Sequence, residues 1–149
     1  MNGYRWFPLR LAGCIFLPCA AFIIAGAASA YPALTEDRPD CDLGAGPCFR
    51  EMKGLGITFD IQPKPVKAMG DLTFSVKVSG GKVRGGITID LEMPGMFMGK
   101  NRIVLKEAGE GTYRGKGVIP RCPSGKRLWR ASVRVHDTGT ARFLFNVDY

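Results

Sequence analysis

The feature that most constrains the fold is an alternation of apolar and polar residues, repeated in seven short segments. Successive side chains of a β-strand point to opposite faces of the sheet, so a period of two predicts strands with one apolar face. Gly- and Pro-containing turn sequences separate the segments, and none of them shows a convincing helical period. The predicted strands are 56–62, 71–78, 87–93, 101–107, 112–119, 128–135 and 141–149.

Seven short strands without helices predict an all-β fold, an immunoglobulin-like antiparallel β-sandwich. The Cys…Trp…Cys spacing of antibody domains is missing, so the likeness concerns architecture alone. The inward phase of the strands predicts one shared core. Its expected members are Phe59, Phe74, Ile89, Trp129, Val133 and Phe145.

The first 30 residues have the parts of a secretory signal peptide. Arg5 and Arg10 precede an apolar run over 11–25, and the small residues "ASA" end at Ala30. Cleavage there predicts a periplasmic or otherwise extracytoplasmic chain. Two alternatives stay open. Residues 11–30 are long enough for an uncleaved inner-membrane anchor, and "LAGC", ending at Cys14, resembles a lipoprotein box.

Residues 31–53 are rich in Pro, Gly and Asp and are interpreted as a leader before a β-sandwich domain over 54–149. The exported part keeps three cysteines, an odd number in a compartment where thiols oxidise. Cys41 and Cys48 are able to close a small loop. Cys122 is either the partner of one of them or a reactive thiol, and spacing does not decide between these pairings.

Charge and composition exclude several classes of function. The formal net charge is +8, but the basic residues are scattered rather than massed in a tail, so no nucleic-acid partner is expected. His136 is the only histidine and lies in a predicted turn. Neither a catalytic Ser-His-Asp set nor a His-rich zinc site is indicated, and the chain is not expected to be an enzyme.

The stretch "MPGMFM" contains three of the six methionines: Met93, Met96 and Met98. Thioether sulfur is a soft ligand that suits Cu(I). The alternative is structural, because Met93 continues an inward-facing strand phase and the other two share one face. Cys122 is a further candidate ligand, since neighbouring Arg and Lys residues favour the thiolate.

The stretch from residue 87 to 149 resembles the YtkA-like domain family, which is related to the FixH family. The likeness covers roughly residues 54–149. It is carried by the methionine motif, by Asn101, and by the "G-x-Y-x-G" hairpin at Gly111, Tyr113 and Gly115. The resemblance implies an exported immunoglobulin-like sandwich associated with copper handling and with assembly of copper-containing respiratory oxidases. With one histidine, it implies a Cu(I) site of sulfur ligands rather than an imidazole Cu(II) site.

The sequence therefore predicts a periplasmic copper-binding or copper-delivery accessory protein. The expected partner is a copper-containing oxidase or another envelope copper protein, with membrane contact through the N-terminal segment. The alternative is a metal-free envelope interaction module that docks on a membrane or respiratory complex. The candidate metal ligands are Met93, Met96, Met98 and Cys122.

Overall fold

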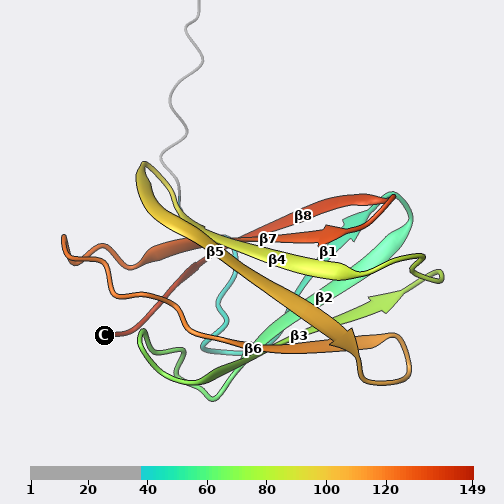
Figure 1. The fold of residues 1–149 in the computed structure, drawn as a ribbon, viewed down its shortest axis with the longest axis horizontal. Coiled ribbons are helices and arrows are strands. Elements are labelled where there is room, and N and C mark those ends of the chain that lie inside the picture. Colours follow the sequence, from blue (N-terminus) through green and yellow to red (C-terminus); the bar gives the residue numbers. More distant parts are fainter. Residues whose placement is uncertain (1–37) are drawn as a thin grey trace, which may run out of the picture. The chain divides into compact units, whose positions relative to one another are not determined.

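The computed structural model describes residues 38–149, which form eight antiparallel strands (Figure 1). The predicted signal or anchor segment lies outside this range. Within it, no helix is long and apolar enough to cross a membrane. The strands are β1 (Cys48–Met52), β2 (Leu55–Gln62), β3 (Leu72–Ser79), β4 (Ile87–Met93), β5 (Met96–Glu107), β6 (Thr112–Gly117), β7 (Leu128–Val135) and β8 (Gly139–Asn146).

The strands form two facing layers that one long strand joins. Their order is β1-β2-β3-β6-β5-β4-β7-β8. Met96 and residues 101–105 of β5 pair with β4, with a shift of register between them. Its last two residues, Lys106 and Glu107, pair with Arg114 and Tyr113 of β6. Figure 1 shows β5 crossing diagonally between the layers. The predicted all-β sandwich is confirmed.

The predicted core is confirmed. All six residues expected in it have no exposed surface: Phe59, Phe74, Ile89, Trp129, Val133 and Phe145. The ring of Phe59 connects the layers, with its centroid 5.2 Å from that of Phe143 and 6.3 Å from that of Phe145. The inward-facing apolar side chains that the alternation predicts thus fill the space between the two layers.

Strand β1 lies inside residues 31–53, the segment predicted to be a leader. All five of its residues pair with β2. The sandwich therefore begins before residue 54. Alternation does not reveal this strand because its inward positions, Cys48, Arg50 and Met52, are only half-buried and one of them is charged. The outward Phe49 reverses the expected pattern, since 59% of its surface is exposed.

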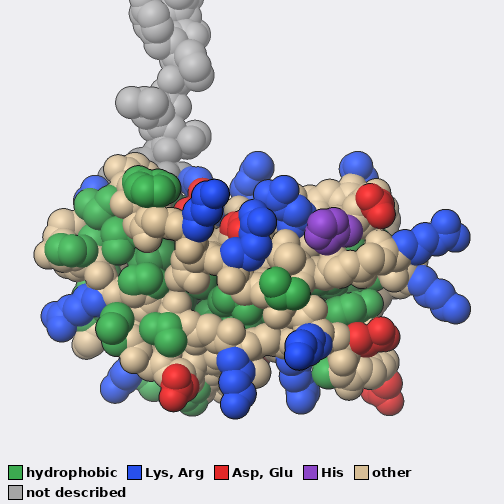
Figure 2. All heavy atoms as spheres, in the orientation of Figure 1, with side chains coloured by type: hydrophobic (Ala, Val, Ile, Leu, Met, Phe, Trp, Pro, Cys, Tyr) green, Lys and Arg blue, Asp and Glu red, His purple; other side chains and the backbone are tan. Residues whose placement is uncertain are grey.

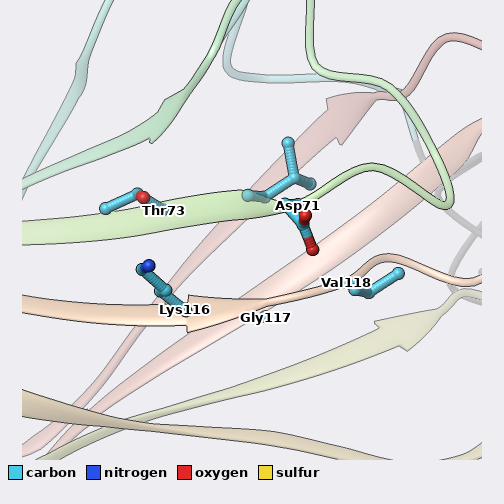
Figure 3. A pocket seen from close by; sticks show the side chains of 6 residues that line it. Asp71, Thr73, Lys116, Gly117 and Val118 are labelled. Atoms are coloured by element: carbon cyan, nitrogen blue, oxygen red, sulfur yellow. The ribbon is translucent and has the colours of Figure 1, made fainter.

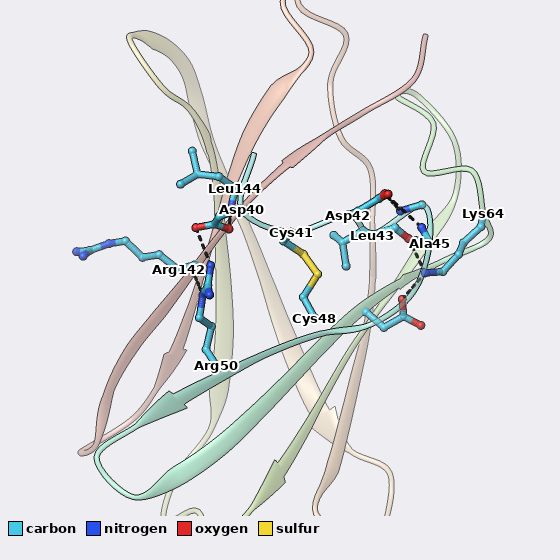
Figure 4. Close-up of a disulfide and its surroundings, with 12 residues drawn as sticks. Asp40, Cys41, Asp42, Leu43, Ala45, Cys48, Arg50, Lys64, Arg142 and Leu144 are labelled. Atoms are coloured by element: carbon cyan, nitrogen blue, oxygen red, sulfur yellow. Dashed lines mark hydrogen bonds and ion pairs between the residues drawn. A yellow bond between two sulfur atoms is a disulfide. The ribbon is translucent and has the colours of Figure 1, made fainter. Parts of the chain in front are cut away.

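The segment before β1 is fixed by a disulfide between Cys41 and Cys48 (Figure 4). The Asp42 carboxylate accepts hydrogen bonds from the backbone N–H groups of Gly44 and Ala45, which closes the turn between the two cysteines. This arrangement of an Asx-type turn under a disulfide gives β1 a defined starting point.

The leader segment also reaches the far layer of the sandwich. The carboxylate of Asp40 accepts the N–H of Leu144 in β8 at 2.9 Å and lies 2.7 Å from the Arg50 guanidinium. Arg50 in turn donates to the carbonyl oxygen of Arg142 at 3.5 Å. β1 and β8 are the two end strands of the sheet order and do not pair with each other through a backbone ladder. The contacts of Asp40 and Arg50 connect these two edges.

Candidate metal centre

The methionine motif forms the hairpin between β4 and β5. Pro94 and Gly95 are its two turn residues, and Met93 lies directly opposite Met96. Proline fixes φ near −65° and suits the first turn position, whereas the second needs a positive φ. Gly95 supplies this with a φ of +72°. The sequence "MPGM" therefore encodes a tight turn that brings two thioether side chains face to face.

The third sulfur comes from the segment between β6 and β7. The Sγ atom of Cys122 lies 3.6 Å from the Sδ atom of Met96, although 26 residues separate them in the sequence. Met93 is buried, and Met96 is half-buried against the same core. Met98 follows two positions along β5 on the same side and is also packed against the core. The fold thus places all four predicted ligands at one end of the sandwich.

Cys122 keeps its thiol. Within residues 38–149 it is the one cysteine outside a disulfide, and only 2% of its surface is exposed. The pairing that the sequence left open is therefore resolved in favour of Cys41 with Cys48. A sulfur that stays reduced in this position remains available as a ligand or nucleophile.

The surroundings of Cys122 lower its pKa below the ordinary value. The largest cause is the Ser124 hydroxyl, whose oxygen lies 3.0 Å from Sγ, and the positive charge of Lys126 contributes less. The pKa shift has the direction expected from the basic neighbours, but its largest cause is the Ser124 hydroxyl. Arg121 lies over the ring of Tyr149 instead of adding to this effect.

The Cys122 thiol donates a weak hydrogen bond to the Met96 thioether, with 3.6 Å between the two sulfur atoms. A metal–sulfur bond of about 2.3 Å, as in zinc thiolates, places two ligands of one tetrahedral or trigonal site about 3.7–4.0 Å apart. The 3.6 Å between Cys122 and Met96 is close to this spacing. A thiolate and neutral thioethers are soft donors of the kind that suits Cu(I) better than harder ions.

The histidine and the Asp90 carboxylate are located away from these sulfurs. Residues 38–149 contain no group of three or more His, Cys, Asp or Glu side chains arranged to hold a metal. His136 follows Val135, which pairs with Ile87, so β4 separates it from Met93 by about 20 Å. Asp90 pairs with Arg102 on the outer face of the sheet.

A separate open hollow of about 490 Å³ lies on the outside of the sandwich, between β3 and β6 (Figure 3). Asp71 and Thr73 line it from the β3 side, and Lys116 and Val118 line it from the β6 side. The hollow is open to solvent, and among the described residues no side-chain hydrogen bond or ion pair joins Asp71, Thr73 and Lys116 across it. The sulfur cluster remains the stronger candidate.

The end of the sandwich that carries the sulfurs is also apolar on its surface. Phe97, between Met96 and Met98, is 88% exposed, and Met69 is 68% exposed. The Met69 backbone donates to Ile119 at 2.9 Å, which ties this loop to the segment that leads to Cys122. Figure 2 shows hydrophobic side chains gathered at the left-hand end of the view, where Figure 1 places the β4–β5 hairpin.

Three comparisons, with protein-family models, with curated proteins and with solved structures, find no match to this chain.

Proposed function

We propose that this chain is an exported Cu(I)-binding protein that acts as a copper-binding or copper-delivery accessory. The observation that carries the proposal is the contact of 3.6 Å between the sulfur atoms of Cys122 and Met96. Chain folding, rather than sequence proximity, produces this contact. It adds a thiol, which can become an anionic soft donor, to the neutral thioethers of the motif.

The four sulfurs have different roles in this proposal. Cys122 is the anionic ligand, and its lowered pKa reduces the cost of losing the thiol proton when the metal binds. Met96 is the neutral ligand beside it. Met93, opposite Met96 in the hairpin, and Met98, two residues along β5, complete the soft environment.

Two further observations support an exported copper protein. A disulfide between Cys41 and Cys48 is typical of oxidising compartments outside the cytoplasm. The resemblance to YtkA-like domains is the second, because its motif residues form the hairpin that holds the thioethers. On this basis the partner is a copper-containing oxidase or another envelope copper protein.

The proposal is tested by anaerobic competition titration of the purified chain with a chromophoric Cu(I) chelator. Leucine keeps the volume and apolarity of methionine, so Met96→Leu with Met98→Leu should cost less than about 1.5 kcal/mol of stability. It removes the thioether donors, and we expect Cu(I) affinity to fall at least about tenfold, equivalent to about 1.4 kcal/mol. Cys122→Ser should lower the affinity further.

Met52→Leu is the matched control, because Met52 is a half-buried methionine of β1. Its Cu(I) affinity should equal that of the wild type. Wild-type affinity in the Met96→Leu, Met98→Leu chain would contradict the proposed site.

The second candidate function is a metal-free envelope interaction module, and the exposed Phe97 favours it. Phe97 in β5 is 88% exposed and Met69 is 68% exposed at the same end of the sandwich, and an exposed apolar patch is typical of an interaction site. Phe97→Ser separates the two functions. It should abolish docking on a membrane or respiratory complex in the second case, and leave Cu(I) affinity unchanged in the first.

A further inference from the structure

The Tyr149 side chain bridges two points of the turn that carries Cys122. Its hydroxyl oxygen accepts a hydrogen bond from the Cys122 backbone N–H at 3.3 Å, and the hydroxyl donates to the carbonyl oxygen of Lys126. Inside the turn, the Gly125 N–H donates to the Cys122 carbonyl at 3.0 Å. One phenol therefore holds both ends of the segment from Cys122 to Lys126.

Tyr149 is itself held in place. The guanidinium carbons of Arg121 and Arg127 lie 5.3 and 5.8 Å from its ring centroid, within the range of cation–π attraction. The backbone carbonyl of the preceding Asp148 accepts the N–H of Ala68 at 2.8 Å. These contacts fix the position of the Tyr149 ring, so its hydroxyl can restrain the turn.

The turn needs such a restraint because it belongs to no strand. β6 ends at Gly117 and β7 begins at Leu128, so Cys122 lies in a segment without ladder hydrogen bonds. Pro120 and Pro123 have no N–H to donate. The orientation of the thiol therefore depends on contacts such as those of Tyr149.

We infer that Tyr149 is a positioning residue that holds the Cys122 thiol against Met96. The identity of the metal, Cu(I), rests on the proposed function. The restraint itself rests on the two hydrogen bonds of the Tyr149 hydroxyl. Tyr149→Phe removes the hydroxyl and keeps the ring between the two arginines. The turn then opens more often, which exposes the thiol and separates the two sulfur ligands.

The first measurement is the rate at which iodoacetamide alkylates Cys122 in the metal-free chain, followed by peptide mass spectrometry. Buried thiols react through local opening. Loss of two hydrogen bonds should raise the rate by about five- to tenfold. The second measurement, Cu(I) affinity, should fall by a similar factor. Tyr113→Phe is the matched control, because Tyr113 is a buried tyrosine of β6.

The proposal is supported if Tyr149→Phe raises the alkylation rate well above that of Tyr113→Phe while the two variants melt at similar temperatures. An alkylation rate within a factor of about two of the wild type would overturn it. If the wild type binds Cu(I), a Tyr149→Phe variant with faster alkylation but unchanged Cu(I) affinity would also overturn it. If the wild type binds no Cu(I), the proposed function fails, and the alkylation comparison alone decides the role of Tyr149.

Discussion

At the residue scale, the proposed copper site depends on the immediate neighbours of one thiol. Cys122 contacts the Met96 thioether on one side and the Ser124 hydroxyl on the other. Its residue type and its basic neighbours are visible in the sequence, so a candidate ligand with a lowered pKa could be predicted. The Ser124 contact and the approach to Met96 could not, because both depend on how an irregular segment folds back.

Ser124→Ala should raise the pKa of Cys122 towards its ordinary value near 9.0, because the hydroxyl that stabilises the thiolate is lost. The pH at which alkylation of Cys122 reaches half its maximum should move upward accordingly. Measuring iodoacetamide reactivity between about pH 6 and pH 10, around the ordinary range of cysteine, checks this shift. An unchanged midpoint would mean that Ser124 does not stabilise the thiolate.

The β4–β5 hairpin and β1 show which elements can be predicted from local sequence. The apolar phase of β4 and the Pro94–Gly95 turn are both readable, and the hairpin they form is the one that the structure contains. β1 is different. Its inward side carries Arg50, and its edge position is defined by a disulfide and by ion pairing rather than by an apolar face.

Reduction of the Cys41–Cys48 disulfide should destabilise the β1 end of the sandwich. The two cysteines are seven residues apart. Chain entropy for so short a loop predicts a loss of about 2–3 kcal/mol of unfolding free energy. Guanidinium unfolding of Cys41→Ala with Cys48→Ala measures it, with Cys122→Ser as the control for a cysteine outside the disulfide. A double variant as stable as the control would show that the disulfide leaves this end unaffected.

At the scale of the whole molecule, the fold follows from alternation because one face of each core strand has to be buried. Phe59 of β2 and Phe145 of β8 come from strands far apart in the sequence and meet in one core. The order of the strands does not follow from alternation. Period-two patterns specify which residues face inward but not which strands are neighbours, so β5 joining the two layers is visible only in the structure.

Phe145→Ala should cost about 3–5 kcal/mol, a large part of the stability of a small domain, because it leaves a cavity in the shared core. Phe97→Ala is the matched control, since the Phe97 side chain is 88% exposed and its loss should change stability by less than about 0.5 kcal/mol. Urea unfolding of both variants checks the difference. Equal losses would contradict a single core built on Phe145.

X-ray absorption at the copper edge, on the chain loaded anaerobically with Cu(I), tests whether Cys122 and Met96 bind copper. We expect sulfur atoms at about 2.3 Å from the copper, without the scattering pattern of imidazole. Cys122→Ser should lose one of these sulfur atoms, while Met52→Leu should give the wild-type spectrum. A shell of nitrogen or oxygen atoms, or a wild-type spectrum from Cys122→Ser, would contradict a copper site built on Cys122 and Met96.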